Sequence, residues 1–99
     1  MLDVNAYLER TEEVKLPDKV LQVYEPTHNM YLAALQHEDA DKMNDYIEYQ
    51  IEAVTAMLNR NKEGVKVKKT DIEDLPRSFI VAVYRALMMM CNEALSDPN

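Results

Sequence analysis

The sequence predicts a mainly α-helical fold: a small bundle of three to four helices in a single domain that spans residues 1–99. The chain holds one glycine and four prolines, so it offers few sharp turns, as is typical of helices joined by short loops. Two long segments are rich in apolar residues at helical spacing. We expect helices at about 3–10, 27–37, 39–61 and 76–95, followed by a polar tail at 96–99.

The first predicted helix, at about 3–10, is short. Val4, Tyr7 and Leu8 share one of its faces, and Asp3 can cap its first turn with a carboxylate oxygen. A helix of about three turns or fewer is not stable by itself and has to pack against the rest of the chain. A second interpretation therefore stays open, in which residues 1–18 form a loosely attached arm.

Residues 19–24 are compatible with either a strand or a helix. Their β-branched and aromatic content favours a strand, whereas Val20, Leu21 and Tyr24 would also line one side of two helical turns. The proline after Glu25 ends either element there. We favour the strand, and the only other candidate strand with which it could pair is 65–68.

The next two predicted helices begin at residues with capping side chains. Thr27 opens the helix at 27–37, whose apolar side consists of Met30, Tyr31, Ala34 and Leu35. Asp39 opens the helix at 39–61, which has the clearest pattern in the chain. Its core-facing positions recur at i, i+3, i+4 and i+7, and they are Met43, Tyr46, Ile47, Gln50, Ile51, Val54, Met57 and Leu58.

A connector follows this long helix. Gly64, the only glycine, suits a left-handed turn that directs the chain away from the helix. The four lysines within 62–69 indicate a solvated connector, with a basic anion-binding loop as the alternative. Thr70 and Glu73 then fit a capping box, and Pro76 suits the first position of the closing helix.

The closing helix contains the most apolar stretch of the sequence. From Phe79 to Cys91 it holds one charge, Arg85, and a helix that is apolar all round needs burial all round. The stretch is shorter than the roughly 20 residues that cross a bilayer, and a domain of this size rarely wraps a helix completely. The run Met88–Met90 suits an adaptable binding surface as well as a core. We expect one face to contact a partner or a second copy, and the candidates are Ile80, Val81, Tyr84, Met88, Met89 and Cys91.

Composition argues against several classes of function. The formal net charge of −7 disfavours a nucleic-acid binder, which needs clustered Lys and Arg. A single cysteine cannot form an intrachain disulfide, which favours a reducing cytoplasm. The start of the chain is acidic where a signal peptide would be basic and apolar, and no segment predicts a membrane span. We therefore expect neither nucleic acid nor a membrane as a partner.

No residue pattern predicts a catalytic, cofactor or metal site. His28 and His37 are nine residues apart, a spacing that does not place two ligands on one helix face. The carboxylates occur as caps and on solvated faces. Cys91 stands among methionines and is expected to be a small buried side chain rather than a nucleophile. We expect that the protein is not an enzyme and uses no cofactor or metal.

Two segments, taken together, carry a family resemblance. One is Val23–Thr27, in which the step Glu-Pro-Thr leads into an amphipathic helix. The other is Asp71–Pro76, an acidic segment that ends in Leu-Pro before the closing hydrophobic helix. In this order, and in length, acidity and helix content, the chain resembles the small tail assembly chaperones of long-tailed, siphovirus-like bacteriophages and prophages. The segment before Pro17 has no counterpart in that family.

The resemblance implies a non-catalytic function. Proteins of this family bind the long tape measure protein, keep it soluble, assist tail-tube polymerisation around it and leave before the virion is complete. They also self-associate. For this chain the resemblance implies a homo-oligomer in the cytoplasm of a bacterial host, with the tape measure protein as its partner. The alternative is a small acidic regulatory or adaptor protein, such as an antitoxin or an inhibitor, that acts by protein–protein binding.

Overall fold

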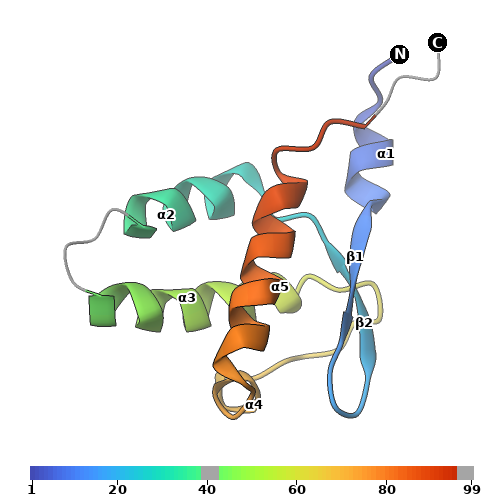
Figure 1. Ribbon diagram of the computed structural model, residues 1–99. Helices are drawn as coiled ribbons and strands as arrows, with labels where there is room; N and C mark the ends of the chain where they lie inside the picture. Colours follow the sequence, from blue (N-terminus) through green and yellow to red (C-terminus); the bar gives the residue numbers. More distant parts are fainter. Residues whose placement is uncertain (39–42, 96–99) are drawn as a thin grey trace.

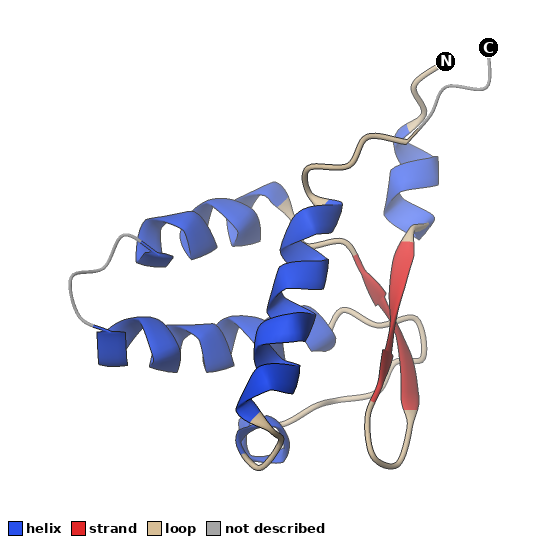
Figure 2. Ribbon diagram, viewed as in Figure 1, coloured by secondary structure: helices blue, strands red, loops and turns tan. Residues whose placement is uncertain are grey.

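The computed structural model describes residues 1–38 and 43–95, and it confirms a mainly helical domain (Figure 1). In chain order the elements are α1 (Val4–Glu9), β1 (Thr11–Lys15), β2 (Val20–Tyr24), α2 (His28–Glu38), α3 (Met43–Leu58), α4 (Lys69–Glu73) and α5 (Arg77–Met90). In the view of Figure 2, α2 and α3 extend to one side of α5, while both strands lie on the other. Helix α5 contacts α3 and β1, so it stands at the centre of the domain.

The two strands form an antiparallel hairpin whose register pairs Val14 with Leu21. Leu21 and Val23 are 0% exposed, and the residues between and beside them point away from the core, as a half-buried strand requires. The strand predicted at 19–24 is therefore confirmed. The prediction that it pairs with 65–68 is wrong, because that segment is not a strand. A neighbour across one short turn costs less loop-closure entropy than a partner forty residues away.

The N-terminal helix predicted at about 3–10 is confirmed as α1. Asp3 caps it, since its Oδ1 accepts a hydrogen bond from the Asn5 backbone N–H at 2.9 Å. Val14 and Leu16 are 5% and 7% exposed, so the hairpin is integrated into the core and does not belong to a loose arm. Helix α1 itself buries no residue.

The helices predicted at 27–37 and 39–61 correspond to α2 and α3. The Thr27 hydroxyl accepts a hydrogen bond from the Met30 backbone N–H at 3.1 Å, which confirms the predicted cap. The predicted cap Asp39 lies outside the described residues, as does the predicted tail at 96–99.

Helix α3 ends at Leu58, three residues before its predicted end, and side chains then organise the connector. Asn61 Nδ2 donates to the carbonyl oxygens of Leu58 and Val65 at 2.8 and 2.7 Å, and Asn61 Oδ1 accepts from the Val65 N–H at 2.8 Å. Gly64 has φ +70°, the left-handed conformation that the sequence predicted. The lysines of 62–69 are exposed, and Val67 is buried among them.

The closing segment differs from its prediction at both ends. The capping box predicted for Thr70 and Glu73 is wrong, because α4 already begins at Lys69 and Asp71 Oδ2 accepts from the Lys68 backbone N–H at 3.2 Å. Either acidic side chain near the start of a helix can accept a hydrogen bond from a free backbone N–H of the capping residue. The local spacing therefore does not show whether Asp71 or Glu73 takes this role. Helix α5 follows Pro76 directly and ends at Met90, five residues before the predicted end.

The core lies between the hairpin, α3, α4 and α5. Its largest fully buried side chains come from these elements and are Leu21, Val23, Val54, Met57, Leu58, Ile72 and Leu87. Helix α2 buries only Ala34. The hairpin side of α5 therefore holds most of the core, and α2 adds little to it. None of the described helices combines the length and apolar composition of a membrane-spanning segment.

Candidate functional site

The six side chains predicted as interface candidates differ in how deeply the structure buries them. Ile80 and Tyr84 are each 3% exposed and belong to the core, so they contact the chain's own helices. Met89 is 60% exposed. Half-buried positions between these extremes are Val81, Met88 and Cys91. Helix α5 thus has one buried face and one open face, and Met89 marks the open face.

An open groove, here called the α2–α5 groove, lies between α2 and α5. The two helices are tied together near both ends of α2: Tyr31 donates a hydrogen bond to Asn92 Oδ1 at 3.3 Å, and Tyr84 donates to Glu38 Oε1 at 2.9 Å. Between these ties the side chains stay accessible. The groove is lined by Tyr31, Leu35, Glu38, Arg85, Met88, Met89 and Asn92.

A second hollow, of about 410 Å³, continues the groove towards α3 and the start of α5. It shares Glu38, Arg85 and Met88 with the groove and is also lined by Arg77 and Val81. Neither arginine side chain makes a hydrogen bond or ion pair with any residue in 1–38 or 43–95. In a protein of net charge −7, two cations without side-chain partners therefore line this hollow, and Arg85 also lines the groove.

The floor of this hollow holds a buried amide. Gln50 is 3% exposed, and its Nε2 donates a hydrogen bond to the Tyr46 hydroxyl at 3.3 Å. Its Oε1 has no partner among the described residues. A buried acceptor without a partner costs free energy, and Arg10 Nε, next to the hairpin, is likewise buried without a partner.

Tyr84 and His37 fix the position of α2. Burial raises the pKa of Tyr84 above its ordinary value of 10.0, and the hydrogen bond to Glu38 and that carboxylate's charge raise the pKa further. Tyr84 therefore remains a protonated donor at neutral pH. His37 stacks on Tyr49 of α3, with ring centroids 3.6 Å apart and an interplanar angle of 5°. Both contacts hold the C-terminal half of α2 at the edge of the groove.

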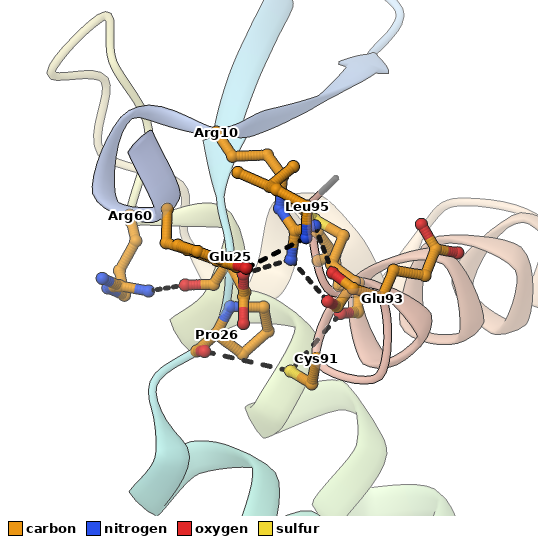
Figure 3. A network of polar contacts seen from close by, with 10 residues as sticks. Arg10, Glu25, Pro26, Arg60, Cys91, Glu93 and Leu95 are labelled. Carbon is orange, nitrogen blue, oxygen red and sulfur yellow. Dashed lines mark hydrogen bonds and ion pairs between the residues drawn. The ribbon is translucent and has the colours of Figure 1, made fainter. Parts of the chain in front are cut away.

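Arg10 joins the N-terminal segment to the end of α5 (Figure 3). Its guanidinium forms an ion pair with the Glu25 carboxylate and donates to the carbonyl oxygens of Met90 and Glu93 at 2.5 and 2.6 Å. These carbonyls lie at the C-terminus of α5, where the helix leaves acceptors without partners. Arg10 therefore caps α5. The sequence offered no signal for this role, because it depends on a contact across eighty residues.

The side chains considered for chemistry have structural partners. Burial raises the pKa of the Cys91 thiol, the Glu25 charge raises it further, and Arg10 acts in the opposite direction, so Cys91 is a neutral thiol at neutral pH. His37 Nδ1 lies 2.9 Å from the Ala33 carbonyl oxygen. Within 1–38 and 43–95, no group of three His, Cys, Asp or Glu side chains is placed to hold a metal ion.

Sequence reasoning missed several side chains of the groove. Leu35 was assigned to the apolar side of its helix, yet it is 38% exposed. Asn92 was not among the candidates. Arg85 alone carried a signal, as the single charge in the apolar stretch of α5.

The chain matches no protein-family model, no curated protein and no solved structure. The function is therefore argued from the groove itself and from the resemblance of the two motifs. Both motifs have a clear place in this structure, because each leads into one of the helices that form the groove.

Proposed function

We propose that this protein is a non-catalytic tail assembly chaperone of a long-tailed phage or prophage, which binds the tape measure protein through the α2–α5 groove and assists tail-tube polymerisation. It acts in the cytoplasm of the bacterial host and is absent from the finished virion. The observation that carries the proposal is the apolar surface formed by the exposed Met89 and Leu35 and the half-buried Met88 between two fixed helices. Methionine-lined grooves accept apolar helix faces of varied shape.

The positions of the two motifs support this proposal. Glu25–Thr27 leads into α2: Arg60 donates a hydrogen bond to the Glu25 carbonyl oxygen, Pro26 is buried and Thr27 caps the helix. Asp71–Pro76 forms the end of α4 and the start of α5. Both motifs thus set where a groove helix begins.

The test is co-purification of the protein with fragments of the tape measure protein encoded in the same phage or prophage genome. Met89→Glu places a charge in the apolar centre of the groove and should weaken binding at least about tenfold, equivalent to about 1.4 kcal/mol. Ala82→Glu is the matched control, because Ala82 is exposed on the same helix and does not line the groove.

Both variants should fold like the parent chain, since both positions are exposed. Equal binding by Met89→Glu and Ala82→Glu would place the client elsewhere. If no fragment of the tape measure protein co-purifies with the parent chain, the proposed function is wrong. A small adaptor or inhibitor would then be the better interpretation.

A further inference from the structure

The two strands of the hairpin differ at their outer edges. The connector after α3 covers the edge of β2, because the Lys62 N–H donates a hydrogen bond to the Gln22 carbonyl oxygen at 2.9 Å. The Tyr24 N–H donates to the Arg60 carbonyl oxygen at 2.8 Å. The Gln22 N–H donates to Glu63 Oε1 at 2.9 Å. The backbone groups along the outer edge of β2 therefore have partners within the chain.

The outer edge of β1 has no such cover. The Leu16 N–H donates to the Lys19 carbonyl oxygen at 2.8 Å inside the hairpin, and inward and outward positions alternate along an antiparallel strand. The backbone groups of Thr11, Glu13 and Lys15 therefore point outward. None of them makes a hydrogen bond to a described residue outside the hairpin. Glu13 and Lys15 are exposed, so their free donors and acceptors are accessible to another strand.

An apolar hollow of about 340 Å³ lies at the C-terminal end of this edge. It is formed by the end of β1 and by the junction of α4 and α5, and its lining residues are Lys15, Leu16, Pro17, Leu75, Pro76 and Phe79. Leu16 is buried and faces the core. A residue that pairs with Leu16 in an added strand points to the same face, towards this hollow.

The same face of β1 holds an acidic side chain without a partner. Glu12 pairs with Val23, which is fully buried, so Glu12 points to the core face of the hairpin. Its half-buried carboxylate makes no hydrogen bond or ion pair with any residue in 1–38 or 43–95. Glu12 and Leu16 are four residues apart, about 13 Å along an extended strand. An added strand therefore meets an apolar hollow and a free carboxylate at that spacing on one face.

We infer that β1 binds an extended segment of a partner protein as a third, antiparallel strand. Main-chain hydrogen bonds to Glu13 and Lys15 supply affinity, while the hollow and Glu12 select the side chains. The segment carries an apolar residue opposite Leu16 and, four positions later, a Lys or Arg opposite Glu12. A basic segment also suits a protein of net charge −7. Pairing with β1 of a second copy is disfavoured, because it brings glutamates together.

This surface is independent of the proposed function. It lies on the hairpin side of α5, away from α2, and no residue of the hairpin lines the α2–α5 groove (Figure 2). Its short, charged strand resists unselected strands, so a bound segment has to supply matching side chains.

The probe is a capped peptide, Leu-Thr-Val-Thr-Lys, whose first and last residues would lie opposite Leu16 and Glu12. It is added at millimolar concentration to the isotope-labelled full-length chain, and amide hydrogen exchange is followed by NMR. The amides of Glu13 and Lys15 should exchange freely in the chain alone and at least about fivefold more slowly with peptide. The Val14 amide is bonded within the hairpin and should change little.

Two substitutions at one position separate the backbone edge from the side chain. Glu13→Pro removes the outward N–H but none of the hydrogen bonds that hold the hairpin ladder, so proline is tolerated there. Its affinity for the peptide should fall about tenfold. Glu13→Thr is the matched control and should bind like the parent chain. Both variants lose the hydrogen bond from Gln22 Nε2, so its loss cancels, and circular dichroism checks that both are folded.

A charge exchange tests the selecting carboxylate and does not require Glu13→Pro to fold. Glu12→Lys should bind Leu-Thr-Val-Thr-Glu more tightly than Leu-Thr-Val-Thr-Lys, whereas the parent chain should show the opposite preference. Three results would overturn the inference: no protection of Glu13 and Lys15 by the peptide, equal affinity of folded Glu13→Pro and Glu13→Thr, or an unchanged preference in Glu12→Lys. Protection of these two amides in the chain alone, increasing with concentration, would also overturn it, because a second copy would then occupy the edge.

Discussion

The two faces of α5 differ in composition and in surroundings. The buried positions are aliphatic or aromatic, whereas the exposed positions are Arg77, Ser78, Ala82, Arg85 and Met89. On the inner face Ile80, Val83 and Leu87 are at most 6% exposed, and this helix packs against α3 and β1. On the outer face Met89 is 60% exposed, and α2 approaches only through polar ties at its two ends. An apolar helix is therefore not evidence for burial on every side. What covers each face depends on which neighbouring elements reach it.

The polar contacts that hold the two sides also differ. On the hairpin side the backbone of the connector after α3 is tied to β2, since Lys62 N–H donates to the Gln22 carbonyl oxygen at 2.9 Å and Tyr24 N–H donates to the Arg60 carbonyl oxygen at 2.8 Å. On the other side α2 is held to the end of α5 by side-chain hydrogen bonds, from Tyr31 to Asn92 and from Tyr84 to Glu38. Each side also holds one buried side-chain atom without a partner among the described residues, Arg10 Nε and Gln50 Oε1.

The largest expected difference between the two faces is in stability. Leu87→Ala should lower the free energy of unfolding by about 2–5 kcal/mol, because it leaves a cavity in the core. Met89→Ala should change it by less than about 0.5 kcal/mol, because Met89 is mostly in solvent. Urea denaturation at neutral pH measures both values. Similar losses for the two variants would show that the outer face is covered in solution.

A smaller effect concerns the connector that closes the inner face. Asn61→Ala removes a buried amide that makes three hydrogen bonds, and it should cost about 1–3 kcal/mol. The exposed side chain of Lys62 provides the control, and Lys62→Ala should be nearly neutral in the same urea titration. If Asn61→Ala is also neutral, the hairpin does not depend on this connector for its position.

The hydrogen bond from Tyr84 of α5 to Glu38 of α2 predicts that the stability of the domain depends on pH. Tyr84→Phe should cost about 1 kcal/mol at neutral pH, because the lost hydrogen bond ends on an exposed carboxylate. The pKa of Tyr84 is raised in the folded state above 10.0. Its stabilising contribution is therefore complete below pH 10 and decreases as the pH rises through the folded-state pKa. Parent and Tyr84→Phe unfolding curves should accordingly converge above pH 10, and a constant difference would contradict this assignment.

The smallest effect is on thiol reactivity at the C-terminal end of α5. Because the pKa of Cys91 is raised, alkylation by iodoacetamide should be slower than for an unfolded control peptide at pH 8. The rate should increase with pH with a midpoint above 9.0, the ordinary value. A midpoint below 9.0 would mean that Arg10 outweighs burial and the Glu25 charge at this position.

Several features of the fold could be predicted because they depend on neighbouring residues. Asp3 and Thr27 cap helices, Gly64 adopts a left-handed turn, and β2 ends at Tyr24, two residues before Pro26. Each involves contacts within a few residues, so short-range chemistry decides it. The capping box at Thr70 shows the limit of such signals, since Asp71 took the role assigned to Glu73.

The site was only partly predictable. An apolar surplus on α5 could be recognised from composition, and Met88 and Met89 were among the candidates. Ile80 and Tyr84 looked equivalent to them in the sequence and proved to be buried. Periodicity tells which residues share a face, but it does not tell which face a neighbouring element covers.

The sequence by itself determined the helical class, the caps of α1 and α2 and the excess of apolar surface on α5, because these follow from local spacing and side-chain type. The tertiary structure alone decided three things. It paired β1 with β2, it brought Arg10 to the end of α5, and it placed Arg77 and Arg85 in one hollow between α3 and α5. All three depend on residues distant in the chain, whose proximity results from how the elements pack.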